Sequence, residues 1–252
     1  IEHEAVADTA QASGLPVEEI PVTAAGIVDL AWLGARLEGW DAGRDGRPLL
    51  ALMLANNEIG TIQPVAAAAE LMRDHDGLVL VDAIQAVGKI PVDFAGLGAD
   101  YMAISAHKFG GPQGAGALVA GCNAPLMRQQ RGGGQEKGRR SGTLNVAGIA
   151  GLGLAIEQAV SGLDDFARLA DWRDAMAAGL KQAAPDLHVL GEGAERLPNT
   201  LGIAVPGWKG ETQVMALDLA GFSVSAGSAC SSGKAHRSKI GNATGLDADA
   251  SR

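Results

Sequence analysis

The segment Leu78-Val79-Leu80-Val81-Asp82 is the clearest indication of the fold, because it is a short continuous apolar run that ends in a carboxylate. A run without alternation is typical of a parallel strand that is covered on both faces. Similar runs at Leu49 to Leu54 and Tyr101 to Ile104 predict two more strands, and the Ala-rich Val65 to Arg73 predicts a helix between the first two strands. Gly114 to Val119 predicts a short return strand after a glycine-rich turn. The alternation indicates an α/β fold with a mainly parallel sheet and helices on both faces.

The second half of the chain has a different pattern. Two long helices are predicted, Ile149 to Val160 and Phe166 to Ala183, with Leu163 to Asp165 as the break and N-cap region between them. A strand at Thr200 to Val205 and a helix at Val214 to Leu219 follow. These segments predict a smaller α+β domain.

Composition limits the possible functions. The 252 residues are 47% hydrophobic and 19% charged, which is typical of a globular chain with a large interior, and we expect residues 1–147 and 148–252 to form parts of two domains. A net charge of -9 leaves no basic surface for nucleic acid or anionic lipid. No apolar stretch reaches the roughly 20 residues of a membrane helix. With only two cysteines and no secretory signal, we expect a cytoplasmic protein without a membrane or nucleic-acid role.

Two residues after neighbouring predicted strands have the chemistry of a pyridoxal-phosphate site. Lys108 lies between a strand end and a glycine turn, where its amine can form a Schiff base. Asp82 ends the preceding strand, and a carboxylate facing the ring nitrogen of this cofactor keeps that nitrogen protonated. Taken alone, Lys108 would be a surface lysine and Asp82 a helix N-cap. Their joint position favours the cofactor site.

Nearby polar side chains add weaker signals. Gln85 offers an amide to the phenolic oxygen of the ring, as does Asn57 after an earlier strand. Ser105 and His107 flank the candidate lysine and offer a hydroxyl and an imidazole to a phosphate. A turn-forming serine and a structural histidine are the common alternatives.

The two cysteines have different surroundings. Cys230 lies among nine small residues, Ser225 to Gly233, which favours a thiol on a mobile loop over a buried structural cysteine; a flexible linker is the weaker alternative. Cys122 follows a predicted strand and is expected to have no catalytic role. The pair cannot supply a four-ligand zinc site. Whether Cys230 is also a transient iron-sulfur ligand stays open.

In their residues and in their order along the chain, several segments resemble those of the cysteine desulfurases of the NifS/IscS type, which are fold-type I pyridoxal-phosphate enzymes of the class-V aminotransferase family. The resemblance runs over nearly the whole chain, and its combination of motifs is specific. The segments that carry it are Glu2 to Val6, Asn56 to Gly60, Val81 to Lys89, Ser105 to Lys108, Gly132 to Glu136, Arg140 to Thr143 and the loop around Cys230.

The resemblance implies a role for each matching residue. Lys108 would bind pyridoxal 5'-phosphate and move protons, and Cys230 would take sulfur from L-cysteine as a persulfide, with release of alanine. His3 would stack on the ring and act as acid and base. The other implied cofactor-binding residues are Asp82 at the ring nitrogen, Gln85 at the phenolic oxygen, Asn57 beside the ring, Ser105 and His107 at the phosphate, and Thr143 at the phosphate of the other subunit of a homodimer.

The resemblance also implies partners and gaps. A sulfur-acceptor or iron-sulfur scaffold protein would receive the persulfide sulfur. The chain begins after the family's phosphate-cradling turn and stops before the arginine that grips the substrate carboxylate, so we expect weak cofactor retention and poor activity from this segment alone. The alternatives are a selenocysteine lyase or another class-V aminotransferase-like enzyme and, from a different class, a catalytically inactive truncated partner in binding or assembly.

Overall fold

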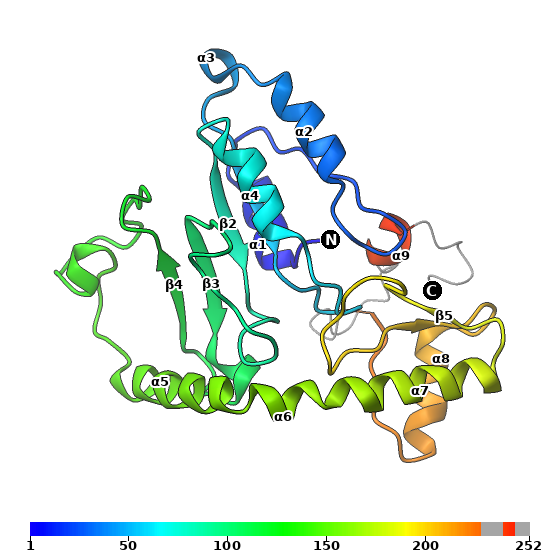
Figure 1. Cartoon of the computed structure of the whole chain (residues 1–252). Coiled ribbons are helices and arrows are strands. Elements are labelled where there is room, and N and C mark those ends of the chain that lie inside the picture. Colours follow the sequence, from blue (N-terminus) through cyan, green and yellow to red (C-terminus); the bar gives the residue numbers. More distant parts are fainter. Residues whose placement is uncertain (228–238, 245–252) are drawn as a thin grey trace.

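The computed structural model describes residues 1–227 and 239–244, and a four-stranded sheet lies in its first half (Figure 1). The strand order is β1 (Leu49–Met53), β2 (Leu78–Asp82), β3 (Tyr101–Ser105) and β4 (Gly116–Ala120). The first three strands are parallel, and β4 runs antiparallel to β3. The predicted mainly parallel sheet with a return strand is confirmed.

The register of the sheet brings three strand ends to one edge. Met53 of β1 pairs with Asp82 of β2, and Asp82 pairs with Ala103 of β3. Because parallel strands share one direction, the segments that follow them leave the sheet at the same edge. Ligands of such sheets bind at this edge, beyond the carboxyl ends of the strands.

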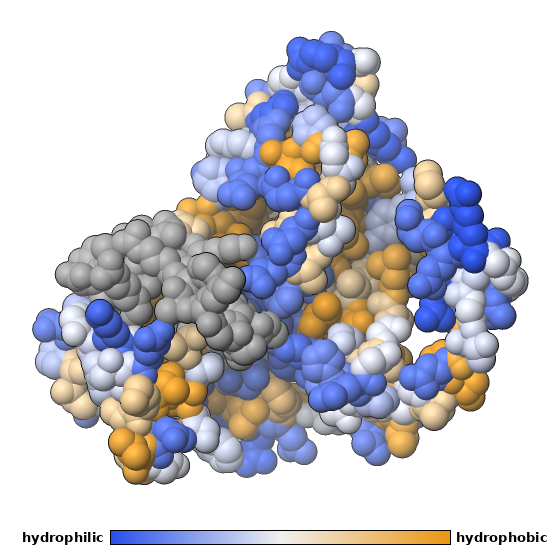
Figure 2. Space-filling model, turned by 180° about the vertical axis from the view of Figure 1, so that it is seen from behind, coloured by the Kyte–Doolittle hydropathy of each residue, from blue (hydrophilic) through white to orange (hydrophobic). Residues whose placement is uncertain are grey.

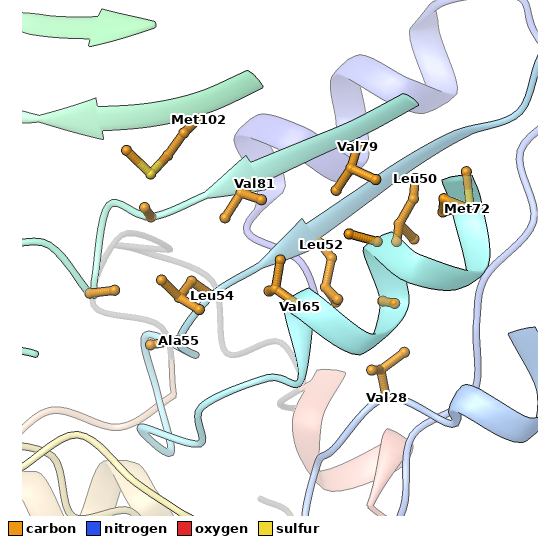
Figure 3. Close-up of a cluster of buried hydrophobic side chains, with 14 of the residues drawn as sticks. Val28, Leu50, Leu52, Leu54, Ala55, Val65, Met72, Val79, Val81 and Met102 are labelled. Atoms are coloured by element: carbon orange, nitrogen blue, oxygen red, sulfur yellow. The ribbon is translucent and has the colours of Figure 1, made fainter. Parts of the chain in front are cut away.

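The core lies between the sheet and α4 (Val65–Arg73), as Figure 3 shows. Leu50 and Leu52 of β1 face Val65 and Met72 of the helix, and all four side chains are buried. Burial of side chains of this size stabilises a fold by about 1.5 to 3 kcal/mol each. The continuous apolar run of β1 therefore fixes how the strand and the helix pack.

Other helices complete the two faces of the sheet. Figures 1 and 3 place α4 on one face and α1 (Glu4–Ala12) on the other. Next to α4 lies α2 (Leu30–Glu38), whose buried Leu33 and Leu37 are one helical turn apart. A short helix, α3 (Ala42–Asp45), precedes β1. Helices on both faces were predicted, and this layering is found.

Beyond the sheet, a series of helices leads to a small second sheet. The remaining elements, in chain order, are η1 (Ala106–Phe109), which precedes β4, η2 (Glu136–Gly138), α5 (Val146–Ser161), α6 (Leu163–Ala167), α7 (Leu169–Ala183), β5 (His188–Val189), β6 (Ile203–Ala204), α8 (Gly210–Leu219) and α9 (Lys239–Ala243). Figure 1 shows α5, α6 and α7 in succession from the large sheet to β5 and α8. The predicted boundary at residues 147 and 148 falls inside α5 and stays a prediction.

Two predicted elements of this half differ from the structure. The break between the long helices lies at Gly162, and Leu163 to Asp165 are helical because their two acidic side chains suit the first turn of α6. The helix axes bend by 63° at this break. The strand predicted at 200–205 is only Ile203–Ala204, paired antiparallel with β5.

Apolar side chains are also exposed in the second half. Trp172 of α7 and Met215 and Leu219 of α8 are largely exposed. Figure 2 shows hydrophobic residues gathered where α8 lies. Within residues 1–227 and 239–244, no single helix is long and apolar enough to cross a membrane, and the bent pair of Val146–Ser161 and Leu163–Ala183 passes that test only when its two parts are joined.

Candidate active site

Asp82 and Lys108 lie at the same edge of the large sheet. Asp82 is the last residue of β2 and is buried. Lys108 follows β3, the neighbouring strand, within the single turn of η1, which ends at Gly110 in the left-handed conformation with φ of 86°. The two charges are close enough for Lys108 to favour the ionised form of Asp82. The structure therefore brings the two predicted residues together.

One of the two carboxylate oxygens of Asp82 already accepts a hydrogen bond. Its Oδ1 accepts a hydrogen bond of 2.9 Å from the Ile84 amide, and its other oxygen has no hydrogen bond to any described residue. Burial raises the pKa of Asp82, and the Ile84 amide, His3 and Lys108 oppose that rise in this order. The group is thus a desolvated carboxyl whose raised pKa is partly offset by these three neighbours.

His3 reaches this edge from the N-terminal segment. It is the N-cap of α1, and its Nδ1 accepts a 3.1 Å hydrogen bond from the Ala5 amide. This contact leaves Nε2 as the ring nitrogen that can carry a proton. His3 also helps to lower the pKa of Asp82, so the two side chains lie near each other.

The amide of Gln85 is held by a lysine to which the sequence assigned no role. Lys89 Nζ donates to Gln85 Oε1 at 2.6 Å, four residues back in the turn after β2, and Lys89 is itself buried. The pKa of Lys89 is lowered to about 8, mainly by burial and then by the charge of Lys108. Gln85 is half-buried and lies three residues after Asp82.

The predicted phosphate-binding pair is also connected. Ser105 Oγ and His107 Nδ1 are 2.9 Å apart and flank Lys108 in sequence. Ser105 ends β3, and His107 is exposed on η1. Asn57 is half-buried after β1, and its side chain makes no hydrogen bond within the described part of the chain.

Three residues of interest remain, namely Thr143, Cys230 and Cys122. Thr143 is exposed in the segment between η2 and α5, and no described interaction joins it to Asp82 or Lys108. Cys230, the predicted nucleophile, lies outside the described residues. Cys122 is a free, exposed thiol after β4.

A buried carboxyl at the same edge was missed from the sequence. Glu2 Oε1 accepts a 2.9 Å hydrogen bond from the Met53 amide, and its buried Oε2 has no partner among the described residues. The pKa of Glu2 is raised to about 7, mainly by burial, and the nearby charge of Asp82 adds to the rise. Only the position of Glu2 beside the His3 motif could have drawn attention to it.

A cavity of about 280 Å³ adjoins the candidate lysine. It lies between the turn after β2, η1 and the junction of α5 with α6. Asp82 and His3 do not line it, so the cavity lies beside the carboxylate and not over it. Its principal lining residues are Gly88, Lys89, Lys108, Phe109, Ala159 and Phe166.

Comparison with known proteins gives the family. Residues 1–244 match aminotransferase class V. The chain belongs to the class-V aminotransferase family. Fold type I of the pyridoxal-phosphate enzymes, with its mainly parallel sheet, is therefore confirmed, and pyridoxal phosphate is the cofactor of this family.

Several class-V relatives carry a more specific name. A cysteine desulfurase of Cereibacter sphaeroides is 42% identical over 227 residues, which are 90% of this chain and 57% of that protein. The cysteine desulfurase IscS of Dictyoglomus turgidum is 38% identical over 244 residues, 95% of this chain and 60% of that protein. The structure of a NifS-like protein from Rickettsia africae has a TM-score of 0.88 at 28% identity and covers 100% of this chain and 66% of that one. The chain thus spans about three fifths of the length of its curated relatives.

The residues of this class-V chain fit the cofactor. A buried carboxylate with an uncommitted oxygen suits a protonated ring nitrogen, because a cation there would offset the cost of desolvation. A primary amine lies on the adjoining strand end, and a hydroxyl and an imidazole flank that amine. This donor set supplies partners for the ring nitrogen, the aldehyde and the phosphate.

Proposed function

We propose that this protein is a cysteine desulfurase, which uses pyridoxal 5'-phosphate to transfer the sulfur of L-cysteine to Cys230. The overall step is balanced without an outside oxidant: the thiol of Cys230 gains one sulfur atom as a persulfide, and L-cysteine becomes L-alanine. The observation that carries the proposal is the convergence of Lys108, Asp82 and His3 at one edge of a class-V aminotransferase sheet. The proposed substrate, L-cysteine, is taken from the relatives, which are named cysteine desulfurase.

Each site residue has a role in this proposal. The bound cofactor would act as an electron sink for the substrate carbons. Asp82 would hold the proton on the ring nitrogen, and an ion pair at about 4 Å contributes on the order of 4 kcal/mol at an effective dielectric of 20. Lys108 would bind the cofactor covalently through its amine and then carry protons to and from the substrate. His3 would add a second proton carrier through its Nε2 atom.

Other side chains would orient the cofactor. Gln85 would donate to the phenolic oxygen, and Asn57 would lie beside the ring. Ser105 and His107 would bind the phosphate, with the hydroxyl and the imidazole already joined. Thr143, exposed on its loop, would reach the phosphate bound by the second subunit of a homodimer.

The remaining parts of the proposal concern partners. A persulfide is a reactive form of sulfur, and a protein acceptor would protect it from loss to solution. We infer a sulfur-acceptor or iron-sulfur scaffold protein as that partner, in a cytoplasmic setting without membrane or nucleic-acid contact. The acidic net charge of -9 supports the last point.

The experiment measures alanine formed from L-cysteine by the protein loaded with pyridoxal phosphate. Cys230→Ala is expected to abolish alanine formation, because the thiol that accepts the sulfur is then missing. Cys122→Ala is the matched control, since it removes the chain's other thiol, which is exposed and unpaired. Full activity of Cys230→Ala would contradict the proposal and favour a lyase.

A further inference from the structure

Lys89 is a buried cation that the proposed function does not use. It has 9% of its surface exposed, and its Nζ lies 2.6 Å from Gln85 Oε1. In the described part of the chain it forms no ion pair with a carboxylate. Burial of a lysine without a counter-ion costs free energy, and the hydrogen bond to Gln85 offsets part of this cost.

The contact fixes the orientation of an amide. A protonated lysine amine is a donor only, so the carboxamide turns its oxygen toward Lys89. The amide nitrogen of Gln85 then points away from Lys89, and it donates to no described residue. An amide that was free to rotate could present either atom to the ring. The NH2 group of Gln85 therefore remains available as a hydrogen-bond donor.

We propose that Lys89 is a positioning residue that holds the Gln85 carboxamide with its NH2 group toward the phenolic oxygen of pyridoxal phosphate. This inference rests on the proposed function. A phenolate accepts hydrogen bonds, so only the amide nitrogen stabilises it. Below its pKa of about 8 the Lys89 amine is protonated and can only donate, so it holds this orientation of the carboxamide in that range.

The position of Lys89 supports the same role. Lys89 and Lys108 line one cavity, and the charge of Lys108 contributes to the lowered pKa of Lys89. The turn that carries Gln85 and Lys89 therefore lies against the turn that carries the cofactor-binding amine. Gly88 keeps these turns close, because a Cβ at this position would lie 2.8 Å from Phe109 Cβ.

The test is a pH titration of the visible absorbance band of the holoprotein, whose wavelength reports protonation of the lysine-bound cofactor. Loss of a hydrogen bond to the phenolate raises the midpoint of that titration, and we expect a rise of about 0.5 to 1 pH unit in Lys89→Met. Methionine keeps the length of the stem and removes the donor. Should Lys89→Met fail to fold, Lys89→Leu serves for the same comparison.

Gln85→Ala completes a double-mutant cycle. If Lys89 acts through Gln85, Gln85→Ala raises the midpoint by a similar amount, and adding Lys89→Met to it causes no further change. An unchanged midpoint in Lys89→Met overturns the proposal. A shift of the same size in the Gln85→Ala background also overturns it, because Lys89 would then act directly through its charge.

A second measurement does not depend on the proposed function. In the cofactor-free protein, the side-chain amide resonances of Gln85 can be assigned by their loss in Gln85→Ala. Lys89→Met is expected to shift them, because the hydrogen bond at the amide oxygen is lost. Unchanged resonances contradict the positioning role, whereas a wild-type holoprotein without a Lys108-dependent band contradicts the proposed function.

Discussion

Asp82 Oδ1 accepts a hydrogen bond from the Ile84 amide, while the other carboxylate oxygen has no partner among the described residues. Its place after an apolar strand suggested either a local cap or a cofactor partner, and the structure shows that one oxygen can serve each purpose. The local bond stabilises the turn after β2 and fixes the direction of the carboxylate. The second oxygen of Asp82 is therefore available to bind a cationic ligand.

We predict that Asp82→Asn weakens the binding of pyridoxal phosphate by about tenfold or more, because hydrogen bonds to charged groups contribute about 1.5 to 3 kcal/mol. Spectroscopic titration of the apoprotein with cofactor measures the loss. Asp100→Asn is the matched control, since Asp100 also accepts one backbone hydrogen bond in this sheet, from Val79 at 2.8 Å. Equal affinities of the two variants would rule out the role assigned to Asp82.

The buried amine of Lys89 makes stability depend on alkaline pH. Its pKa is lowered from 10.5 to about 8 by burial and by Lys108, so between these values the unfolded chain binds more protons than the folded one. The free energy of unfolding of the wild type, relative to Lys89→Met, should therefore rise from pH 8 to pH 10.5. Urea unfolding at several pH values measures this difference, and a constant or falling difference would contradict the assignment.

The buried carboxyl of Glu2 has the opposite effect in the acid range. Its pKa is raised from 4.5 to about 7 by burial and by Asp82, so the folded chain holds more protons between these values. The wild type should lose stability relative to Glu2→Gln as pH rises from 4.5 to 7. Thermal unfolding of both proteins across this range tests the sign. No pH-dependent difference would mean that Glu2 is solvated.

Sequence reasoning found some of these residues and missed others for a physical reason. Asp82 and Lys108 could be predicted because each directly follows an apolar strand, and strand ends meet at one edge of a parallel sheet. Glu2 and Lys89 are buried by elements that are distant in sequence or on the neighbouring turn, such as β1 for Glu2. Local sequence does not report such burial.

At the level of elements, the strands and α4 agree closely with prediction, and the α5–α6 junction does not. Long apolar runs specify a strand or a helix by themselves. The junction depends on Gly162, which ends α5 with φ of -93° and ψ of 5°, while the acidic residues after it begin α6. Acidic residues suit both a loop and a first helical turn, so the pattern alone could not place the break.

The turn after β2, which contains Gly88, packs closely against η1, and glycine substitutions test this packing. Gly88 and Gly110 both have positive φ, 76° and 86°, so alanine causes comparable backbone strain at each. Only at Gly88 would the added Cβ meet other atoms, Phe109 Cβ at 2.8 Å and Ala159 Cβ at 2.9 Å. We predict that Gly88→Ala costs about 1 to 3 kcal/mol more than Gly110→Ala. Equal unfolding free energies would show that the turns are not packed as described.

For the whole molecule, the α/β class and the parallel sheet could be predicted, whereas the contacts of the second half could not. The strands of the second half have two residues each, which is too short for a periodic signal. Cys230 lies outside the described residues, so its approach to the sheet edge stays a prediction. Lys108 and Asp82, the residues on which the proposed cofactor site depends, both lie in the first half, at one edge of the large sheet.

Locating the cofactor on the chain tests directly whether Lys108 binds it. The protein is incubated with pyridoxal phosphate, reduced with borohydride and digested, and the modified peptide is identified by mass spectrometry. We predict a single stable adduct on Lys108, absent from Lys108→Ala, with the buried Lys89 unmodified. An adduct on another lysine, or none, would contradict the account.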